Sequence, residues 1–232
     1  MGNTIEAREG IIGIVDDTYF DDDTWTIRYL IVKTGDWFSG RKVLISTTAF
    51  GKDTVGQGTF SSSLSIGQIT TSPDIDIDKP VSRHQEAELA AHYSWQSYWG
   101  NGFYPDRVWG VIASPPITDP APIREQKAMK SPMEDLRLQS SNKITGYRVR
   151  ANDGDVGYVH AFIMDERTWQ LSHLVVLIHN WLGGKKVTVP VRYIQSAQWD
   201  ESSILVDMTI DVIRKRPVFD EPEYHTGERS GL

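Results

Sequence analysis

The chain repeats itself after 144 residues, and this internal similarity constrains its fold more than any other feature. With that offset and no net gap, Gly13 falls on Gly157, Trp25 on Trp169, Trp37 on Trp181, Gly40 on Gly184 and Pro73 on Pro217. Glycines and tryptophans rarely coincide in this way by chance. Two copies are too few for a solenoid, which needs about three stacked units. Each copy is therefore predicted to close on itself as a small domain.

Each copy has the residue pattern of short antiparallel strands. In the first copy, Ile11–Phe20 and Trp25–Thr34 are rich in β-branched and aromatic residues, and four turn-forming residues from Asp21 to Thr24 separate them, which predicts a hairpin. Lys42–Ser46 and Phe60–Leu64 predict further strands, and the second copy repeats the plan. Short strands at this density favour a barrel, which leaves no exposed sheet edge. The predicted fold class is mainly β, with two tandem small antiparallel barrels.

The repeat divides the chain into four parts. Residues 1–76 and 143–220 form the two predicted barrel-like domains, residues 77–142 form a connector, and residues 221–232 form a tail that is expected to fray. The connector has a predicted helix at about 82–93, which Ser82 and Gln85 begin with a capping-box pattern, and then a proline-rich linker. Because a unit of this size is only marginally stable alone, we expect the copies to pack on each other or the chain to form a homo-oligomer.

Two long phrases of the sequence resemble the PRC-barrel family. They are Phe20–Val32 continued by Thr34–Ser46, and Gly146–Val159 in the second copy. The segment Pro80–Arg83 and the aromatic residues after it resemble the connector of stand-alone bacterial proteins with two such barrels. The family is named for the cytoplasmic domain of the photosynthetic reaction-centre H subunit and includes the C-terminal domain of a ribosome maturation factor. The resemblance implies docking and regulatory modules without a shared catalytic set.

Composition and charge exclude several classes of function. The chain has no cysteine, so it has no disulfide, thiolate metal site or cysteine nucleophile, in agreement with a cytoplasmic location. Its start shows no secretory signal, and no apolar stretch is long enough for a transmembrane segment. The formal net charge is −7 and neither copy is basic, so direct binding to nucleic acid is not expected.

The titratable clusters do not form a recognisable active site. The acidic cluster Asp16, Asp17 and Asp21–Asp23 lacks the spacing of a calcium loop, and we interpret it as a hairpin tip that faces water. His84 and His92 lie on one face of the predicted helix with Glu88, but the two histidines are about 12 Å apart along its axis, too far to share one metal. We interpret this face as solvated.

The remaining candidates belong to the second copy. His160, His173 and His179 coincide with Asp16, Tyr29 and Gly35 of the first copy, which argues against a site shared by both copies. Arg214-Lys215-Arg216 is interpreted as a solvated helix end, with contact to nucleic acid as the less favoured alternative. We therefore predict no catalytic residue, no metal site and no cofactor.

The connector carries a dense aromatic stretch. As a speculative interaction surface we name Tyr93, Trp95, Tyr98, Trp99, Phe103 and Tyr104. Tyr and Trp dominate the residues that carry binding energy at interfaces, which favours a docking surface. Two small barrels also need buried aromatic area, and the favoured interpretation places these side chains between the barrels.

These observations favour a non-enzymatic tandem PRC-barrel protein that docks or regulates another macromolecule, with a protein partner expected. One alternative is a small-ligand-binding protein or enzyme that uses a cleft between the barrels, lined by connector aromatics. A ribosome- or RNA-linked role, or a role in photosynthetic electron transfer, rests on family analogy alone.

Overall fold

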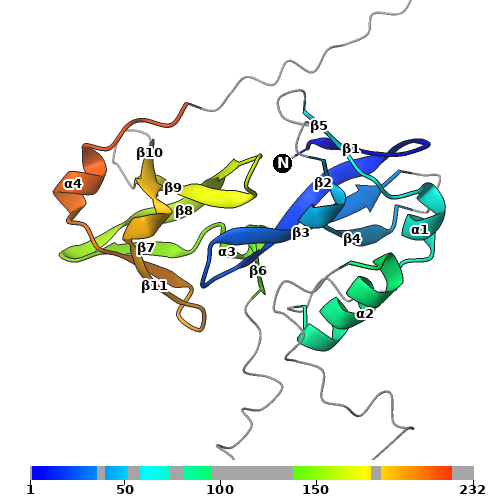
Figure 1. Cartoon of the computed structure of the whole chain (residues 1–232). Helices are drawn as coiled ribbons and strands as arrows, with labels where there is room; N and C mark the ends of the chain where they lie inside the picture. The colour runs from blue at the N-terminus through cyan, green and yellow to red at the C-terminus, as the bar shows by residue number, and fades with distance from the viewer. Residues whose placement is uncertain are drawn as a thin grey trace, which may run out of the picture.

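Most of the chain that can be described lies in β-strands, which confirms the predicted mainly β fold class. The computed structural model describes residues 2–35, 40–51, 58–73, 81–95, 138–178 and 184–220. Two lobes lie side by side (Figure 1). The first lobe, here called the N-terminal unit, contains β1 (Thr4–Ala7), β2 (Gly10–Asp21), β3 (Thr26–Thr34), β4 (Lys42–Ser46), the 3₁₀ helix η2 (Thr47–Ala49), β5 (Thr59–Ser61) and α1 (Ile66–Thr70).

The second lobe, the C-terminal unit, has counterparts of these elements in the same order and one additional strand, β11. It contains β7 (Arg148–Ala151), β8 (Gly154–Asp165), β9 (Gln170–Ile178), β10 (Lys185–Pro190), the 3₁₀ helix η5 (Val191–Tyr193), β11 (Ile194–Gln198), β12 (Ser203–Val206) and α4 (Ile210–Arg214). β7, β8, β9, η5 and α4 begin and end 144 residues after β1, β2, β3, η2 and α1. The offset seen in the sequence is therefore also the offset of the secondary structure.

Three connector elements are described. α2 (Arg83–Tyr93) begins at the N-cap Ser82, whose hydroxyl accepts from the Gln85 backbone N–H, while the Gln85 side chain accepts from the Ser82 backbone N–H. The helix lies on the N-terminal unit, near α1 and β4 (Figure 1). β6 (Leu138–Ser140) and α3 (Ser141–Ile144) lead into the C-terminal unit. No helix among the described residues is long and apolar enough to cross a membrane.

The strands form one twelve-stranded sheet that is open. Its main path runs β11-β12-β7-β8-β9-β3-β2-β1-β5, with β10 paired to β9, β4 paired to β3 and β6 paired to β2. Closure of the N-terminal unit would require a ladder between β4 and β5. The chain instead turns through η2 after β4, and only Phe50 and Ser62 form an isolated bridge. The predicted closed barrels are therefore not confirmed.

One glycine in each unit is required by close approach of two strands. A Cβ atom on Gly13 would lie 2.1 Å from the Lys33 carbonyl oxygen, and one on Gly157 would lie 2.1 Å from the Leu177 carbonyl oxygen. No side chain fits at such a distance, so any substitution must move the backbone of β3 or β9.

The hydrophobic core is continuous across the two units. Buried residues of both lobes, among them Phe20, Leu30, Leu174 and Val187, belong to one packed cluster. The cluster also includes Leu89 of α2 and Leu138 of β6, so the connector contributes to it at both of its described ends.

Candidate functional site

The two units meet at the tips of their long hairpins through a reciprocal contact. The Ile27 N–H donates to the Trp169 carbonyl oxygen at 2.8 Å, and the Leu171 N–H donates to the Trp25 carbonyl oxygen at 2.8 Å. These four residues form two pairs that are 144 residues apart, so the contact has the symmetry of a two-fold dimer within one chain. Trp25 and Trp169 hold left-handed backbone angles, with φ of 53° and 59°.

Aromatic rings pack around this contact. Trp169 of the C-terminal unit packs against both Phe50 and Phe60 of the N-terminal unit, with ring centroids 5.6 Å and 5.2 Å away, and the two phenylalanine rings are 6.1 Å apart. Trp25 stacks on Phe20 at 5.3 Å and lies 6.0 Å from Phe162 of the other unit. Trp25 and Trp169, one repeat pair, therefore hold the two units together.

A cleft of about 610 Å³ opens between the units. Its walls are mostly apolar and come from both sides, with Ile27, Leu30 and Phe60 from the N-terminal unit and Phe162, Met164 and Leu171 from the C-terminal unit. Polar atoms at the cleft come from Thr18, Ser141, Asn142, His160 and Glu166, among others. The cleft suits a small apolar ligand with a few polar groups.

A buried carboxylate fastens the end of the connector to the N-terminal unit. Asp17 is 6% exposed and accepts hydrogen bonds from the Ser140 and Ser141 hydroxyls and from the Asn142 backbone N–H, which lies 3.0 Å from Oδ1. The Thr18 N–H donates to the same oxygen at 2.7 Å. The hydrogen-bonding capacity of this buried carboxylate is met by these donors. Because three of them belong to β6 and α3, Asp17 holds these two elements in place.

A second carboxylate bridges the units at the hairpin tip. Asp22 Oδ2 accepts from Trp199 Nε1 at 3.1 Å and from Gln139 Nε2 at 3.5 Å. Burial raises the pKa of Asp22 above its usual range, as do the charges of Asp23 and Asp21, whereas the two hydrogen bonds oppose the rise. The proton affinity of Asp22 thus depends on the contact between the units.

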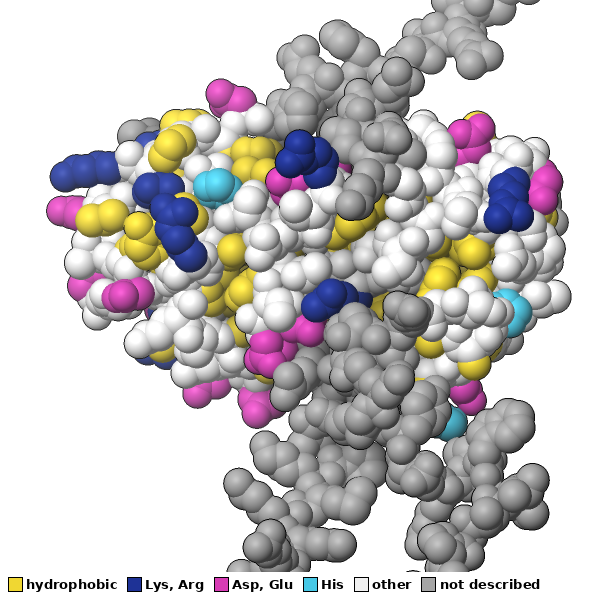
Figure 2. All heavy atoms as spheres, viewed as in Figure 1, with side chains coloured by type: hydrophobic (Ala, Val, Ile, Leu, Met, Phe, Trp, Pro, Cys, Tyr) yellow, Lys and Arg dark blue, Asp and Glu magenta, His cyan; other side chains and the backbone are white. Residues whose placement is uncertain are grey.

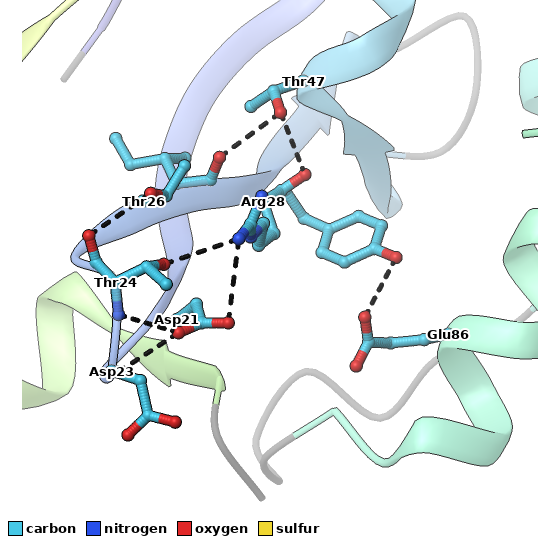
Figure 3. Close-up of polar contacts among 9 residues, drawn as sticks. Asp21, Asp23, Thr24, Thr26, Arg28, Thr47 and Glu86 are labelled. Atoms are coloured by element: carbon cyan, nitrogen blue, oxygen red, sulfur yellow. Dashed lines mark hydrogen bonds and ion pairs between the residues drawn. The ribbon is translucent and has the colours of Figure 1, made fainter. Parts of the chain in front are cut away.

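The outer face of β3 in the N-terminal unit holds α2 through a buried polar contact. Tyr29 Oη donates to Glu86 Oε2 at 3.2 Å, and Glu86 is 1% exposed (Figure 3). At the other end of the helix, His92 Nε2 lies 2.9 Å from the Gln68 carbonyl oxygen of α1. This face of the unit therefore receives a helix that comes from outside the repeat.

The proposed aromatic interaction surface is only partly within the described residues. Tyr93 is buried and stacks on the partly buried Trp95, with ring centroids 4.2 Å apart. Tyr93 is the last residue of α2 and Trp95 follows its C-cap, and Tyr93 lies near Ser72 and Arg41 of the N-terminal unit. The described lining of the cleft does not include these two residues. Tyr98, Trp99, Phe103 and Tyr104 lie outside the described residues, as do Trp37 and Trp181.

The acidic cluster is less exposed than predicted. Asp17 and Asp21 are buried, and Asp21 Oδ1 accepts from the backbone N–H groups of Asp23 and Thr24 (Figure 3). Asp165 makes the same turn with Arg167 and Thr168. The interpretation that the whole cluster faces water is therefore wrong for Asp17 and Asp21, because the returning connector covers the first and the turn itself uses the second.

The histidines do not converge on a shared centre. His84 forms an exposed ion pair with Glu88 at 3.2 Å, while His92 contacts α1. His160 lines the cleft, His173 lies on β9, and His179 is outside the described residues. Within the described ranges, no group of three or more His, Asp or Glu side chains is placed to hold a metal ion.

Two arginines flank His173 on the outer face of the C-terminal unit. Arg216 Nε donates to the Thr188 carbonyl oxygen at 3.2 Å, and the Arg192 guanidinium lies over the Tyr193 ring at 5.1 Å. Burial lowers the pKa of His173, and the positive charges of Arg216 and Arg192 lower it further. Of the basic run predicted to be a solvated helix end, Arg214 and Lys215 are exposed, whereas Arg216 is half-buried beside β10.

Residues 5–60 match the family model of the PRC-barrel domain. The match spans β1 to β4 and reaches into β5, and so covers the strands that carry the Trp25 turn and the outer face that receives α2. No curated protein matches the chain. The PRC-barrel match thus supports the resemblance found in the first copy of the repeat.

Several residues of these sites were missed at the level of sequence. Glu86, Asp17 and Trp199 make their contacts across long separations in the chain, and none is shared between the copies. Glu86 alone carried a usable signal, because it lies on the same helix face as Leu89 and Tyr93, where a carboxylate needs a buried partner.

Proposed function

We propose that this chain is a non-enzymatic protein with two PRC-barrel units that acts as a docking or regulatory module for another macromolecule. The family match supports the first unit, and the common offset of the secondary structure supports the second. The residues shared by the two units have structural roles, and the residues that differ give each unit a different surface.

The position of α2 is the observation that carries this proposal. A helix from outside the repeat lies on the N-terminal unit, with its apolar residues Leu89 and Tyr93 buried and its carboxylate Glu86 bonded to Tyr29. Such an arrangement is the helix-in-groove mode by which many modules bind their partners. The unit thus has a face suited to holding another element of structure.

Cross-linking of the full chain in the cells that produce it tests the proposal. We expect one macromolecular partner to be recovered repeatedly, with cross-links to surface residues of either unit. Turnover of a small molecule by the purified chain, together with no reproducible partner, would contradict a docking function.

The cleft between the units favours a second candidate, the binding of a small apolar ligand. If the cleft binds such a ligand, a panel of apolar acids and alcohols will contain compounds that raise the unfolding temperature, because a ligand that binds only the folded state stabilises it. Replacement of Met164, which lines the cleft, by Trp narrows it and removes that shift. A panel without any stabilising compound argues against this candidate.

A further inference from the structure

The face that holds α2 in the N-terminal unit has an equivalent in the C-terminal unit. With the 144-residue offset, Tyr29, Leu44 and Gln68 correspond to His173, Thr188 and Val212. Tyr29 and Leu44 are buried in the unit that carries α2, whereas His173 and Thr188 are both partly exposed. Among the described helices, none lies on the outer face of β9 and β10 (Figure 1). This face is called the β9–β10 face below and comprises His173, Thr188, Arg192, Val212 and Arg216.

The β9–β10 face combines an exposed apolar side chain with positive charge. Val212 is 48% exposed. Arg192 and Arg216 replace Thr48 and Ser72 of the other unit, and within the described part of the chain neither is ion-paired with a carboxylate. Figure 2 shows Lys and Arg side chains gathered beside hydrophobic ones on the lobe that contains α4 and β10.

The chemistry of the occupant follows from the covered face. There, a carboxylate of α2 approaches the hydroxyl of Tyr29 between buried apolar residues. On the β9–β10 face the corresponding position is an imidazole. Arg216 is bonded to the neighbouring strand at the Thr188 carbonyl oxygen, and Arg192 lies two residues after Pro190, which pairs with His173, so a carboxylate there gains charge-assisted hydrogen bonds. Val212 offers apolar contact to the rest of the helix. A nucleic acid would use the arginines but not Val212, and the chain is acidic overall.

We propose that the β9–β10 face binds a helix of a partner protein that presents a carboxylate between apolar side chains. The inference rests on the proposed docking function and assigns it a surface. His173, Arg192 and Arg216 hold the carboxylate, and Val212 contacts the apolar residues beside it.

A peptide with the sequence of residues 81–95, which contains α2, serves as the probe because it carries the required carboxylate at Glu86. The peptide is labelled with a fluorophore and titrated with the full chain. A second labelled peptide carries Glu86→Gln and is otherwise identical. We expect binding that weakens about tenfold for the Glu86→Gln peptide and by a similar factor for the full chain with Arg192→Gln and Arg216→Gln, since each change removes a charge-assisted hydrogen bond.

A matched control replaces two exposed arginines elsewhere on the C-terminal unit, Arg148 and Arg150, which lie near Asp155. The control variant should bind the peptide as the unaltered chain does, and amide resonances of His173, Thr188 and Val212 should shift on titration. The proposed site is overturned if the peptide does not bind the full chain, or if it binds the Arg192 and Arg216 variant as tightly as the unaltered chain.

Three further outcomes identify other occupants and also overturn the inference. Binding that appears only after removal of residues 221–232 assigns the face to the chain's own tail. Self-association that the Arg192 and Arg216 changes abolish assigns it to a second copy. A partner cross-linked at another face, with no peptide binding here, leaves the docking function in place and removes only this surface.

Discussion

At the scale of single residues, the positions shared by the two units are those that the backbone demands. Asp21 and Asp165 close the same turn, and the tryptophans that follow both adopt a left-handed conformation. Some residues that differ between the units have partners outside their own unit, such as Asp17 and Asp22. The residues shared by the two units therefore maintain the common scaffold, and residues such as Asp17 and Asp22 make contacts that only one unit has.

Replacement of Gly13 by Ala should destabilise the fold strongly. The new Cβ would lie 2.1 Å from the Lys33 carbonyl oxygen, so β2 and β3 must separate, which costs about 3 kcal/mol of unfolding free energy. Gly51→Ala is the control, because nothing lies within 4 Å of its added Cβ, and a change below about 1 kcal/mol is expected there. Urea unfolding of both variants measures the difference, and equal values would contradict the close approach.

Asp17→Ala should loosen the return of the connector. The substitution removes the acceptor of the Asn142 N–H and of two serine hydroxyls, and leaving buried donors unpaired costs about 3 kcal/mol in total. Asp16→Ala removes only a partly exposed ion pair with Lys42 and should cost about 1 kcal/mol or less. Hydrogen exchange should quicken in β6 and α3 of the Asp17 variant only. Unchanged exchange there would show that other contacts hold the connector.

Asp22 should make stability depend on pH in a defined direction. Its folded-state pKa is raised, chiefly by burial, so the native state binds more protons than the unfolded state between the two pKa values. Stability from this group is fully present below the unfolded pKa and is lost as pH rises through the folded pKa. Asp22→Asn removes the charge, so the variant should be more stable than the parent at pH 7, with an advantage that shrinks on acidification. An advantage that grows on acidification would refute the assignment.

At the scale of elements, the strands and the helix α2 were predictable because their signals are local. Alternation, turn residues and the Ser82 capping box all act within a few residues. The pairing of β6 with β2 was not predictable, because Tyr19 and Ser140 are brought together by the tertiary fold alone. The strand β11 was also missed, since Ile194–Gln198 is mostly polar and follows a 3₁₀ helix directly.

The two glutamates of α2 should differ sharply in their effect. Glu86→Ala leaves the buried Tyr29 hydroxyl without this acceptor and should cost about 2 kcal/mol. Glu88→Ala removes an exposed pair with His84 on the same helix and should cost less than about 0.5 kcal/mol. Chemical unfolding and hydrogen exchange of the α2 amides measure both. Similar values for the two variants would mean that α2 does not depend on its buried carboxylate.

At the scale of the whole molecule, the continuous core and the reciprocal hairpin contact join two units that are each small. The predicted architecture of two separate closed barrels does not include this shared core. The sequence pattern indicates where strands lie, but it does not indicate which unit a tryptophan packs against. Trp169 is a repeat residue, yet the rings around it, Phe50 and Phe60, belong to the other unit. The units are therefore expected to unfold together.

Trp169→Ala tests this cooperation directly. Loss of the indole that packs against Phe50 and Phe60 should lower the unfolding free energy by about 3 kcal/mol, because it opens a cavity in the shared core. Hydrogen exchange should quicken in β5 of the N-terminal unit as well as in the C-terminal unit that carries the substitution. Tyr158→Ala is the control, since Tyr158 is 44% exposed on the same unit and should leave the N-terminal unit unaffected. Two separate unfolding transitions, or faster exchange confined to the C-terminal unit, would show that the units are stable independently and that the reciprocal contact only orients them.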